Sequence, residues 1–162
     1  MFSGAKKIQR LRALGTITKL IFHCLYTDTP TILELPDLSN VTYFGDAWKG
    51  NSVTNYLNGL STPFVINPNT TVIGEAGFSG ITNIAGDVNL PYLTTLGVRA
   101  FSNSGIMTVT DLGSVSDFTD TNATYGHGAF AGCTSLQSVI IPSTFTSTSK
   151  LGAAFSGCTS LQ

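Results

Sequence analysis

The sequence has little charge. Only 10% of its 162 residues are Asp, Glu, Lys or Arg, where an ordinary soluble domain has about 25%. The formal net charge is −1, so the chain as a whole creates no field that would attract nucleic acid or a charged membrane. We therefore expect no specific nucleic-acid partner.

Cysteine and histidine are scarce as well. The three cysteines, Cys24, Cys133 and Cys158, are an odd number in a chain of this size, which argues against a disulfide scaffold. The two histidines, His23 and His127, lack the ligand spacing of a metal site. We expect no metal and no cofactor.

Long apolar runs and catalytic motifs are missing too. The longest apolar run is too short to span a bilayer. The stretch after the basic N-terminus makes a poor signal peptide, because Thr16, Thr18, Lys19 and His23 interrupt it and no A-x-A cleavage site follows. No phosphate-binding glycine loop, carboxylate pair or nucleophile–histidine pair is visible. These absences predict a protein without a membrane span that is not an enzyme.

Small polar residues and a repeat are what the chain does have. Serine and threonine number 39 and glycine 17, a mixture that suits short strands and turns better than helices. The heptapeptide F-x-G-C-T-S-L occurs twice, and related segments occur upstream, the loosest at Leu35–Trp48. Five aromatic anchors follow at spacings of 30, 23, 29 and 25 residues: Trp48, Phe78, Phe101, Phe130 and Phe155.

Such a repeat predicts a β-rich solenoid. Each unit is too short to bury its own apolar side, so neighbours stack and share one core. We expect the phenylalanines to form one column along the stack, and we expect Leu136, Ile84 and Leu161 to form a second. After Leu136 the alternation of a short parallel strand places Val139 and Ile141 inward, with Ser138 and Ile140 outward.

The repeat resembles a known family. The segment AFAGCTSLQSVIIP, up to Pro142, is similar to the BspA-type leucine-rich repeat, whose pattern is roughly A-F-x-x-C-x-x-L-x-x-I-x-I-P. The resemblance covers roughly Leu35 to Gln162. It implies a right-handed leucine-rich-repeat coil with short parallel strands and few short helices. It also implies a role in adhesion or protein binding, and an extracellular, cell-surface or virion-associated location.

The sequence departs from this pattern in three places. Asp111, Leu112 and Gly113 replace the usual I-P after Val109, so that strand should end early or bulge. The connections Gly113–Gly128 and Asn51–Thr62 are expanded. Insertions in solenoids form loops on one face, which either bind a partner or are neutral surface.

Two domains are predicted. Residues 1–30 should form an N-terminal cap, with a short basic helix from about Ala5 to Leu14 and a strand within Thr16–Tyr26, since an uncapped first coil would expose its core. The alternative is a helix that docks onto a larger assembly. Residues 31–162 should form a solenoid of about five irregular repeats, the last one incomplete. The basic residues of the first segment face solvent or meet a partner: Lys6, Lys7, Arg10, Arg12 and Lys19.

The two cysteines of the repeat have a structural explanation. Cys133 and Cys158 occupy the repeat position that Ile81 fills in another unit. A position that accepts Cys or Ile calls for a small buried hydrophobe, and free cysteine behaves as one. We therefore expect stacked thiols, although adjacent coils lie within reach of a disulfide.

Two functions fit this chain. The first is a non-enzymatic binding or adhesion module that presents Thr108, Thr110, Ser138 and Ile140 to a protein or a surface glycan. The second is a structural subunit of a larger assembly, a phage virion or a bacterial surface structure, which docks through its basic N-terminus and the open C-terminal repeat edge. An enzyme that uses Cys133 or Cys158 is a third hypothesis, and we expect alkylation of these thiols to have no effect.

Overall fold

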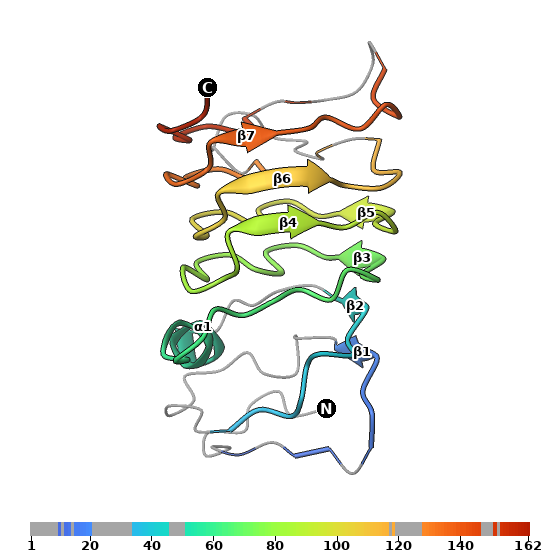
Figure 1. The fold of residues 1–162 in the computed structure, drawn as a ribbon, viewed down its shortest axis with the longest axis vertical. Helices are drawn as coiled ribbons and strands as arrows, with labels where there is room; N and C mark the ends of the chain where they lie inside the picture. The colour runs from blue at the N-terminus through green and yellow to red at the C-terminus, as the bar shows by residue number, and fades with distance from the viewer. Residues whose placement is uncertain are drawn as a thin grey trace.

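The chain forms coils that stack along the long axis of the molecule (Figure 1). The computed structural model describes residues 10, 12–13, 15–20, 34–45, 51–116, 118, 128–146, 151 and 153–162. Several sequence predictions lie outside the described residues: the anchor Trp48, Cys24, both histidines and most of the connection Gly113–Gly128.

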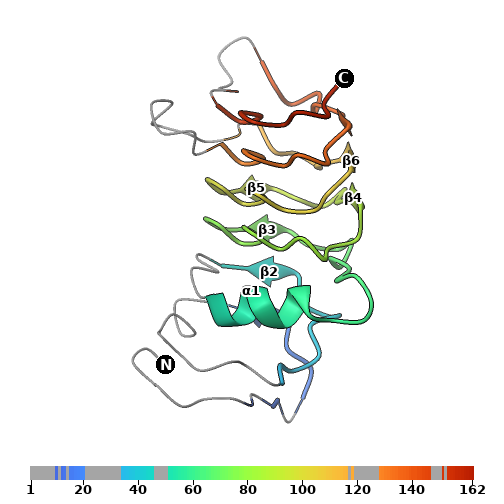
Figure 2. The same cartoon turned by 90° about the vertical axis from the view of Figure 1, so that its left-hand side faces the viewer.

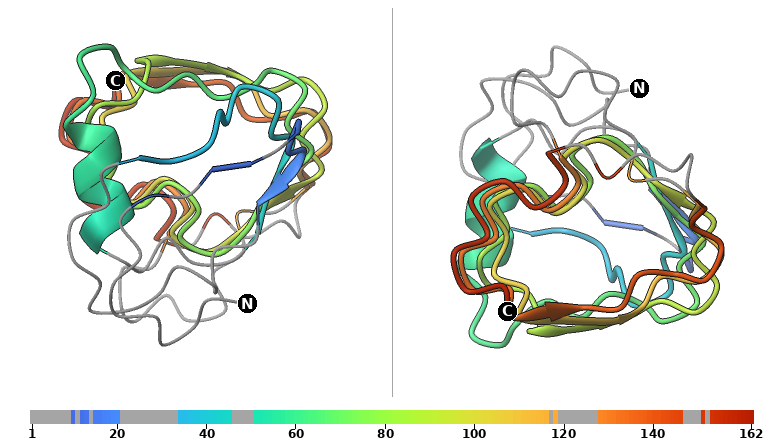
Figure 3. Two further views of the ribbon diagram at one scale, coloured as in Figure 1. Left: turned by 90° about the horizontal axis from the view of Figure 1, so that it is seen from below. Right: turned by 90° about the horizontal axis from the view of Figure 1, so that it is seen from above.

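The stack carries two parallel sheets. The first has the order β1-β2-β3-β5, and its strands are Lys19–Leu20, Tyr43–Phe44, Val72–Ile73 and Thr95–Leu96. The second has the order β4-β6-β7, from Asp87–Asn89, Thr108–Asp111 and Ser138–Val139. Seen along the stack, the two sheets lie on different sides of the coil (Figure 3). A coil therefore supplies one short strand to each sheet, β3 before β4 and β5 before β6, which agrees with the short parallel strands predicted.

A tight turn follows each of the four anchor phenylalanines, Phe78, Phe101, Phe130 and Phe155. The residue two positions after the phenylalanine has a positive φ of 54° to 75° in all four coils. Glycine adopts this backbone region at little cost, and asparagine tolerates it better than other side chains. The four residues are Gly80, Asn103, Gly132 and Gly157.

The predicted phenylalanine column is confirmed. The rings of Phe78, Phe101, Phe130 and Phe155 stack with centroids 5.7, 5.5 and 5.4 Å apart and interplanar angles of 16°, 7° and 8°. The first three rings are fully buried, as Leu136 is. One repeat position therefore forms a continuous aromatic core along the solenoid.

The expanded stretch after residue 50 contains a helix. Helix α1 spans Asn51–Asn58 and lies on the side of the coil away from β1 and β2 (Figures 2 and 3). Two asparagines fasten its end to the next coil. The Asn58 side chain accepts hydrogen bonds from the backbone N–H groups of Thr82 and Asn83, at 2.8 and 3.1 Å. The Asn83 amide in turn donates to the carbonyls of Leu57 and Leu60.

The helix predicted for Ala5–Leu14 is wrong at its described residues. Arg10 forms a parallel β-bridge with Glu34, and Arg12 and Ala13 lie outside any helix. The other residues of that segment lie outside the described part of the chain. The strand predicted within Thr16–Tyr26 is present as β1.

The predicted strands are confirmed with two refinements. The irregularity expected after Val109 is a bulge, because the register between β4 and β6 shifts between Val88 and Asn89. Val139 packs against the core as predicted. The inward orientation predicted for Ile141 is wrong: its side chain is 39% exposed, since β7 ends at Val139 and the strand alternation does not continue.

Candidate binding face

The β4-β6-β7 sheet has an inner and an outer side. Val88 and Val109 pair across β4 and β6 and are buried, and Val139 extends this inner row. The alternating side chains point away from the core, as the period of two in a strand requires. We call this side the outer face: Asp87, Asn89, Thr108, Thr110, Ser138 and Ile140.

The structure brings the four predicted contact residues together on the outer face. Ile140 has a 60% exposed side chain, and Ser138 and Thr110 are exposed as well. The threonine hydroxyls also tie coils together. Thr108 donates to a carboxylate oxygen of Asp87 at 2.5 Å, and Thr110 donates to the carbonyl of Val88 at 3.3 Å. Ser138 on β7 and Ile140 immediately after it are thus the exposed part of the predicted set at the last strand.

Apolar side chains that the sequence did not single out border this face. Met107 is exposed immediately before β6, and its side chain covers Gly86, where a Cβ atom would lie 2.9 Å from the sulfur. Val65 is 65% exposed on the neighbouring coil. Together with Ile140 they give a surface of mixed hydroxyl, amide, carboxylate and apolar groups, which is typical of protein-binding surfaces rather than of a charged ligand site.

A pocket opens beside β4, at the end of the sheet. It has a volume of about 210 Å³ and lies between the segment of residues 65–68 and strand β4. The buried side chains of Ile66, Val88 and Leu90 contribute to its lining, with the exposed residues Val65 and Asp87. We call it the edge pocket. Asp87 therefore belongs both to the outer face and to the edge pocket.

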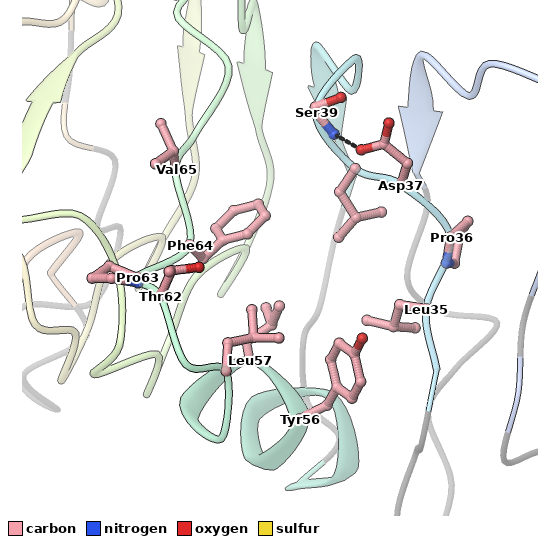
Figure 4. A pocket seen from close by; sticks show the side chains of 12 residues that line it. Leu35, Pro36, Asp37, Ser39, Tyr56, Leu57, Thr62, Pro63, Phe64 and Val65 are labelled. Atoms are coloured by element: carbon pink, nitrogen blue, oxygen red, sulfur yellow. Dashed lines mark hydrogen bonds between the residues drawn. The ribbon is translucent and has the colours of Figure 1, made fainter.

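A second pocket lies between α1 and the preceding coil. It has a volume of about 310 Å³. Figure 4 shows Tyr56 and Leu57 of α1 opposite Leu35 and Pro36. The Asp37 carboxylate at its rim accepts a hydrogen bond from the backbone N–H of Ser39 at 2.9 Å, which lowers its pKa. This pocket could accept an apolar group, and none of the predicted contact residues lines it.

Part of the basic N-terminal segment is neutralised within the chain. Arg12 donates two hydrogen bonds to the Glu34 carboxylate, at 2.7 and 3.0 Å, and Arg10 lies 3.9 Å from it. The hydrogen bond from Arg12 lowers the pKa of Glu34. Arg12 and Glu34 line a third pocket of about 520 Å³, together with Asp37. Two of the basic residues thus have an acidic partner within the chain.

The two repeat cysteines behave as stacked thiols. Cys133 is fully buried and donates to the carbonyl of Phe101 at 2.8 Å, and Cys158 donates in the same way to Phe130 at 3.1 Å. Both are free. Burial raises the pKa of each thiol, and in Cys133 a hydrogen bond with Ser104 opposes this effect. A protonated, buried thiol is a poor nucleophile, because the thiolate is the reactive form.

The raised pKa of Cys133 predicts an alkaline loss of stability. Folding favours the protonated thiol, so its contribution is complete below the unfolded pKa, about 8.5, and is lost as the pH rises through the raised folded pKa. The free energy of unfolding should fall above about pH 8.5, by at most about 1.4 kcal/mol per pH unit. Urea unfolding between pH 7 and 10, compared with the variant Cys133→Val, measures this. Equal slopes in both proteins would contradict it.

The described residues hold no group of three or more His, Cys, Asp or Glu side chains placed to bind a metal ion. Within the same part of the chain, no helix has the length and apolar character needed to cross a membrane.

The repeat matches a family of known proteins. A family model described as "BspA type Leucine rich repeat region" matches residues 54–162, in six copies. Its region begins after the looser copy at Leu35–Trp48, which marks the part of the chain where the repeat pattern is strong. No curated protein and no solved structure gives a match.

Proposed function

Because the chain belongs to the BspA-type leucine-rich repeat family, we propose that it is a non-enzymatic binding module that recognises a protein or a surface glycan through its outer face. Leucine-rich repeats of this kind suggest protein interaction or adhesion and are typically not enzymes. The observation that supports this placement is the side-by-side arrangement of Thr108, Thr110, Ser138 and Ile140 on one sheet. Extracellular, cell-surface or virion-associated location is part of the same proposal.

The chemistry of the outer face favours a protein over a glycan as the partner. It carries exposed aliphatic side chains at both ends, Met107 before β6 and Ile140 after β7, with hydroxyl and amide groups between them. A mixture of apolar and hydrogen-bonding groups with little charge is typical of a protein–protein interface. Its backbone is held on a regular sheet, so little conformational entropy is lost on binding.

The proposal predicts that one substitution on the outer face weakens binding. We would select protein and glycan ligands by display on the intact chain, and then measure their dissociation constants for Ser138→Arg. We expect at least a tenfold loss, since a long charged side chain within an interface blocks contact and leaves its charge unpaired. The matched control is Thr95→Arg, an exposed threonine on β5 of the other sheet, where we expect less than a twofold change.

Equal losses in both variants, or no loss in Ser138→Arg for any selected ligand, would remove the outer face as the site. Circular dichroism and the midpoint of urea unfolding would show that both variants remain folded.

A structural role in a larger assembly is the second candidate. Strand β7 pairs only with β6 among the described strands, and Leu161 is exposed beside it, where the Gln162 N–H donates to the Gln137 carbonyl. An unpaired strand edge with apolar neighbours favours association. The right-handed winding of the coil and the cap formed by residues 1–30 remain predictions. Light scattering of the purified chain tests it: a monomer at all concentrations, with no binding to particle components, would count against it.

A further inference from the structure

Strand β4 has an open edge. Its pairing with β6 uses the main-chain groups of alternate residues: the Gly86 carbonyl accepts from Thr108, and the Leu90 N–H donates to Asp111. By the alternation of a parallel ladder, the main-chain groups of Asp87 and Asn89 face the other side. There the only described pairing is the bridge between Phe64 and Ile84, which lies before the strand begins.

The edge pocket lies along this open edge. After the bridge at Ile84, the segment of residues 65–68 and strand β4 no longer pair, and the edge pocket lies between them. The N–H and C=O groups of Asp87 and Asn89 therefore border a space that reaches the buried side chains of Ile66, Val88 and Leu90. Unpaired strand groups beside apolar lining are what an added strand requires.

The size and charge of the edge pocket indicate what would enter it. Its volume of about 210 Å³ exceeds the roughly 150 Å³ of a cavity that accepts a benzene molecule, so it holds one apolar side chain. Asp87 is the one ionisable residue in its lining, and it is exposed. Its carboxylate favours a cationic neighbour.

We propose that the edge of β4 binds an extended peptide segment of a partner protein by strand addition, with one apolar side chain in the edge pocket and a Lys or Arg beside Asp87. The partner's main chain pairs with Asp87 and Asn89, and the alternation of its residues sends one side chain inward and its neighbours outward. This inference rests on the proposed binding function and adds to it a partner class and a second site, separate from Ser138 and Ile140.

The first experiment selects peptide ligands that need the open edge of β4 for binding. Displayed random hexapeptides are selected on the intact chain and counter-selected on Asn89→Pro, which removes one N–H at the open edge and none that faces β6. Proline is tolerated on edge strands. The expected peptides contain an apolar residue flanked by Lys or Arg. Enrichment of no peptide, or of acidic peptides, would overturn the proposal.

Matched variants then separate main-chain pairing from side-chain contact. For a selected peptide we expect at least a tenfold weaker dissociation constant with Asn89→Pro, and less than a twofold change with Asn89→Ala, which keeps the N–H. Methylation of alternate peptide amides should also weaken binding at least tenfold. Asp87→Asn, which still accepts the Thr108 hydroxyl, should weaken it severalfold. Hydrogen exchange at the Asp87 and Asn89 amides should slow on binding.

Binding that tolerates peptide methylation and Asn89→Pro would overturn strand addition. The variant Ser138→Arg separates this proposal from the proposed function. Peptides that lose affinity with Ser138→Arg and not with Asn89→Pro would refute the edge site and leave the outer face standing. The opposite result is also informative. Peptides that lose affinity with Asn89→Pro and keep it with Ser138→Arg, together with a failure to find any ligand for the outer face, would support the edge site and refute the proposed function of the outer face.

Discussion

Replacing Phe130 by alanine should lower the free energy of unfolding by about 3–5 kcal/mol. The Phe130 ring is fully buried and stacks against Phe101 at 5.5 Å and Phe155 at 5.4 Å. Phe118 meets it edge-on at 5.4 Å. The substitution therefore removes three aromatic contacts and leaves a cavity that three coils share. Against a total stability of about 5–15 kcal/mol for an ordinary domain, this loss is large.

Urea unfolding monitored by circular dichroism measures this effect, and two further variants serve as controls. Tyr92→Ala removes an aromatic ring that is 61% exposed, and we expect it to change the free energy by no more than about 0.5 kcal/mol. Phe130→Leu keeps most of the buried volume and should cost less than about 1.5 kcal/mol. If Phe130→Ala were as mild as Tyr92→Ala, the phenylalanine column would not be the core of the stack.

The column is also the part of the fold that the sequence predicts best. Its signal is a fixed residue at nearly constant spacing, and each phenylalanine needs the same neighbours above and below. Stacking follows from the repeat because a unit of this length cannot bury its ring alone. The outer positions of β6 and β7 follow from strand alternation in the same way, as the pair Thr108 and Ser138 shows. Periodic features were predictable because the period itself carries the information.

Features that break the period were not predictable in the same way. The two asparagines that fasten α1, Asn58 and Asn83, are one coil apart in space but 25 residues apart in the chain. No repeated pattern links them. The edge pocket arises where residues 65–68 and β4 stop pairing, which depends on how one coil diverges from the next. The helix predicted around Arg10 rests on the local spacing of the apolar residues Ile8, Leu11 and Leu14. The bridge from Arg10 to Glu34 is a long-range contact that this spacing does not show.

The same contrast explains the location of the candidate sites. Regular positions of the stack are occupied by core residues and by hydrogen bonds between coils, as the Thr94 hydroxyl shows by donating to the Thr71 carbonyl. The edge of β4 is left without a partner strand only where the regularity fails. A binding surface on a repeat protein therefore combines a regular face, which the sequence indicates, with an irregular edge, which requires the structure.

Replacing Gly128 by alanine should cost about 2–4 kcal/mol, because there is no room for a side chain between two coils. A Cβ atom at Gly128 would lie 2.2 Å from the Ala153 carbonyl oxygen and 2.3 Å from the Ala154 Cα atom. Both are backbone atoms, so the next coil would have to move away. That movement weakens the hydrogen bonds from Phe130 to Ala154 at 2.9 Å and from Gly132 to Ser156 at 2.7 Å. Overpacking costs about 1–3 kcal/mol, and each weakened bond adds up to about 1 kcal/mol.

The control for this substitution is Gly15→Ala, since a Cβ atom at Gly15 would have nothing within 4 Å. It should leave the free energy of unfolding within about 1 kcal/mol of the original value. We expect a small increase and not a decrease, because alanine restricts the conformations of the unfolded chain. Hydrogen exchange locates the damage: in Gly128→Ala the amides of Phe130 and Gly132 should exchange faster, while that of Phe78, two coils away and bonded to Ala100, should change less. Equal acceleration at all three amides would mean that the stack opens as one unit and not coil by coil. A free energy unchanged by Gly128→Ala would mean that residues 153–154 do not pack against Gly128 as closely as the structure has them.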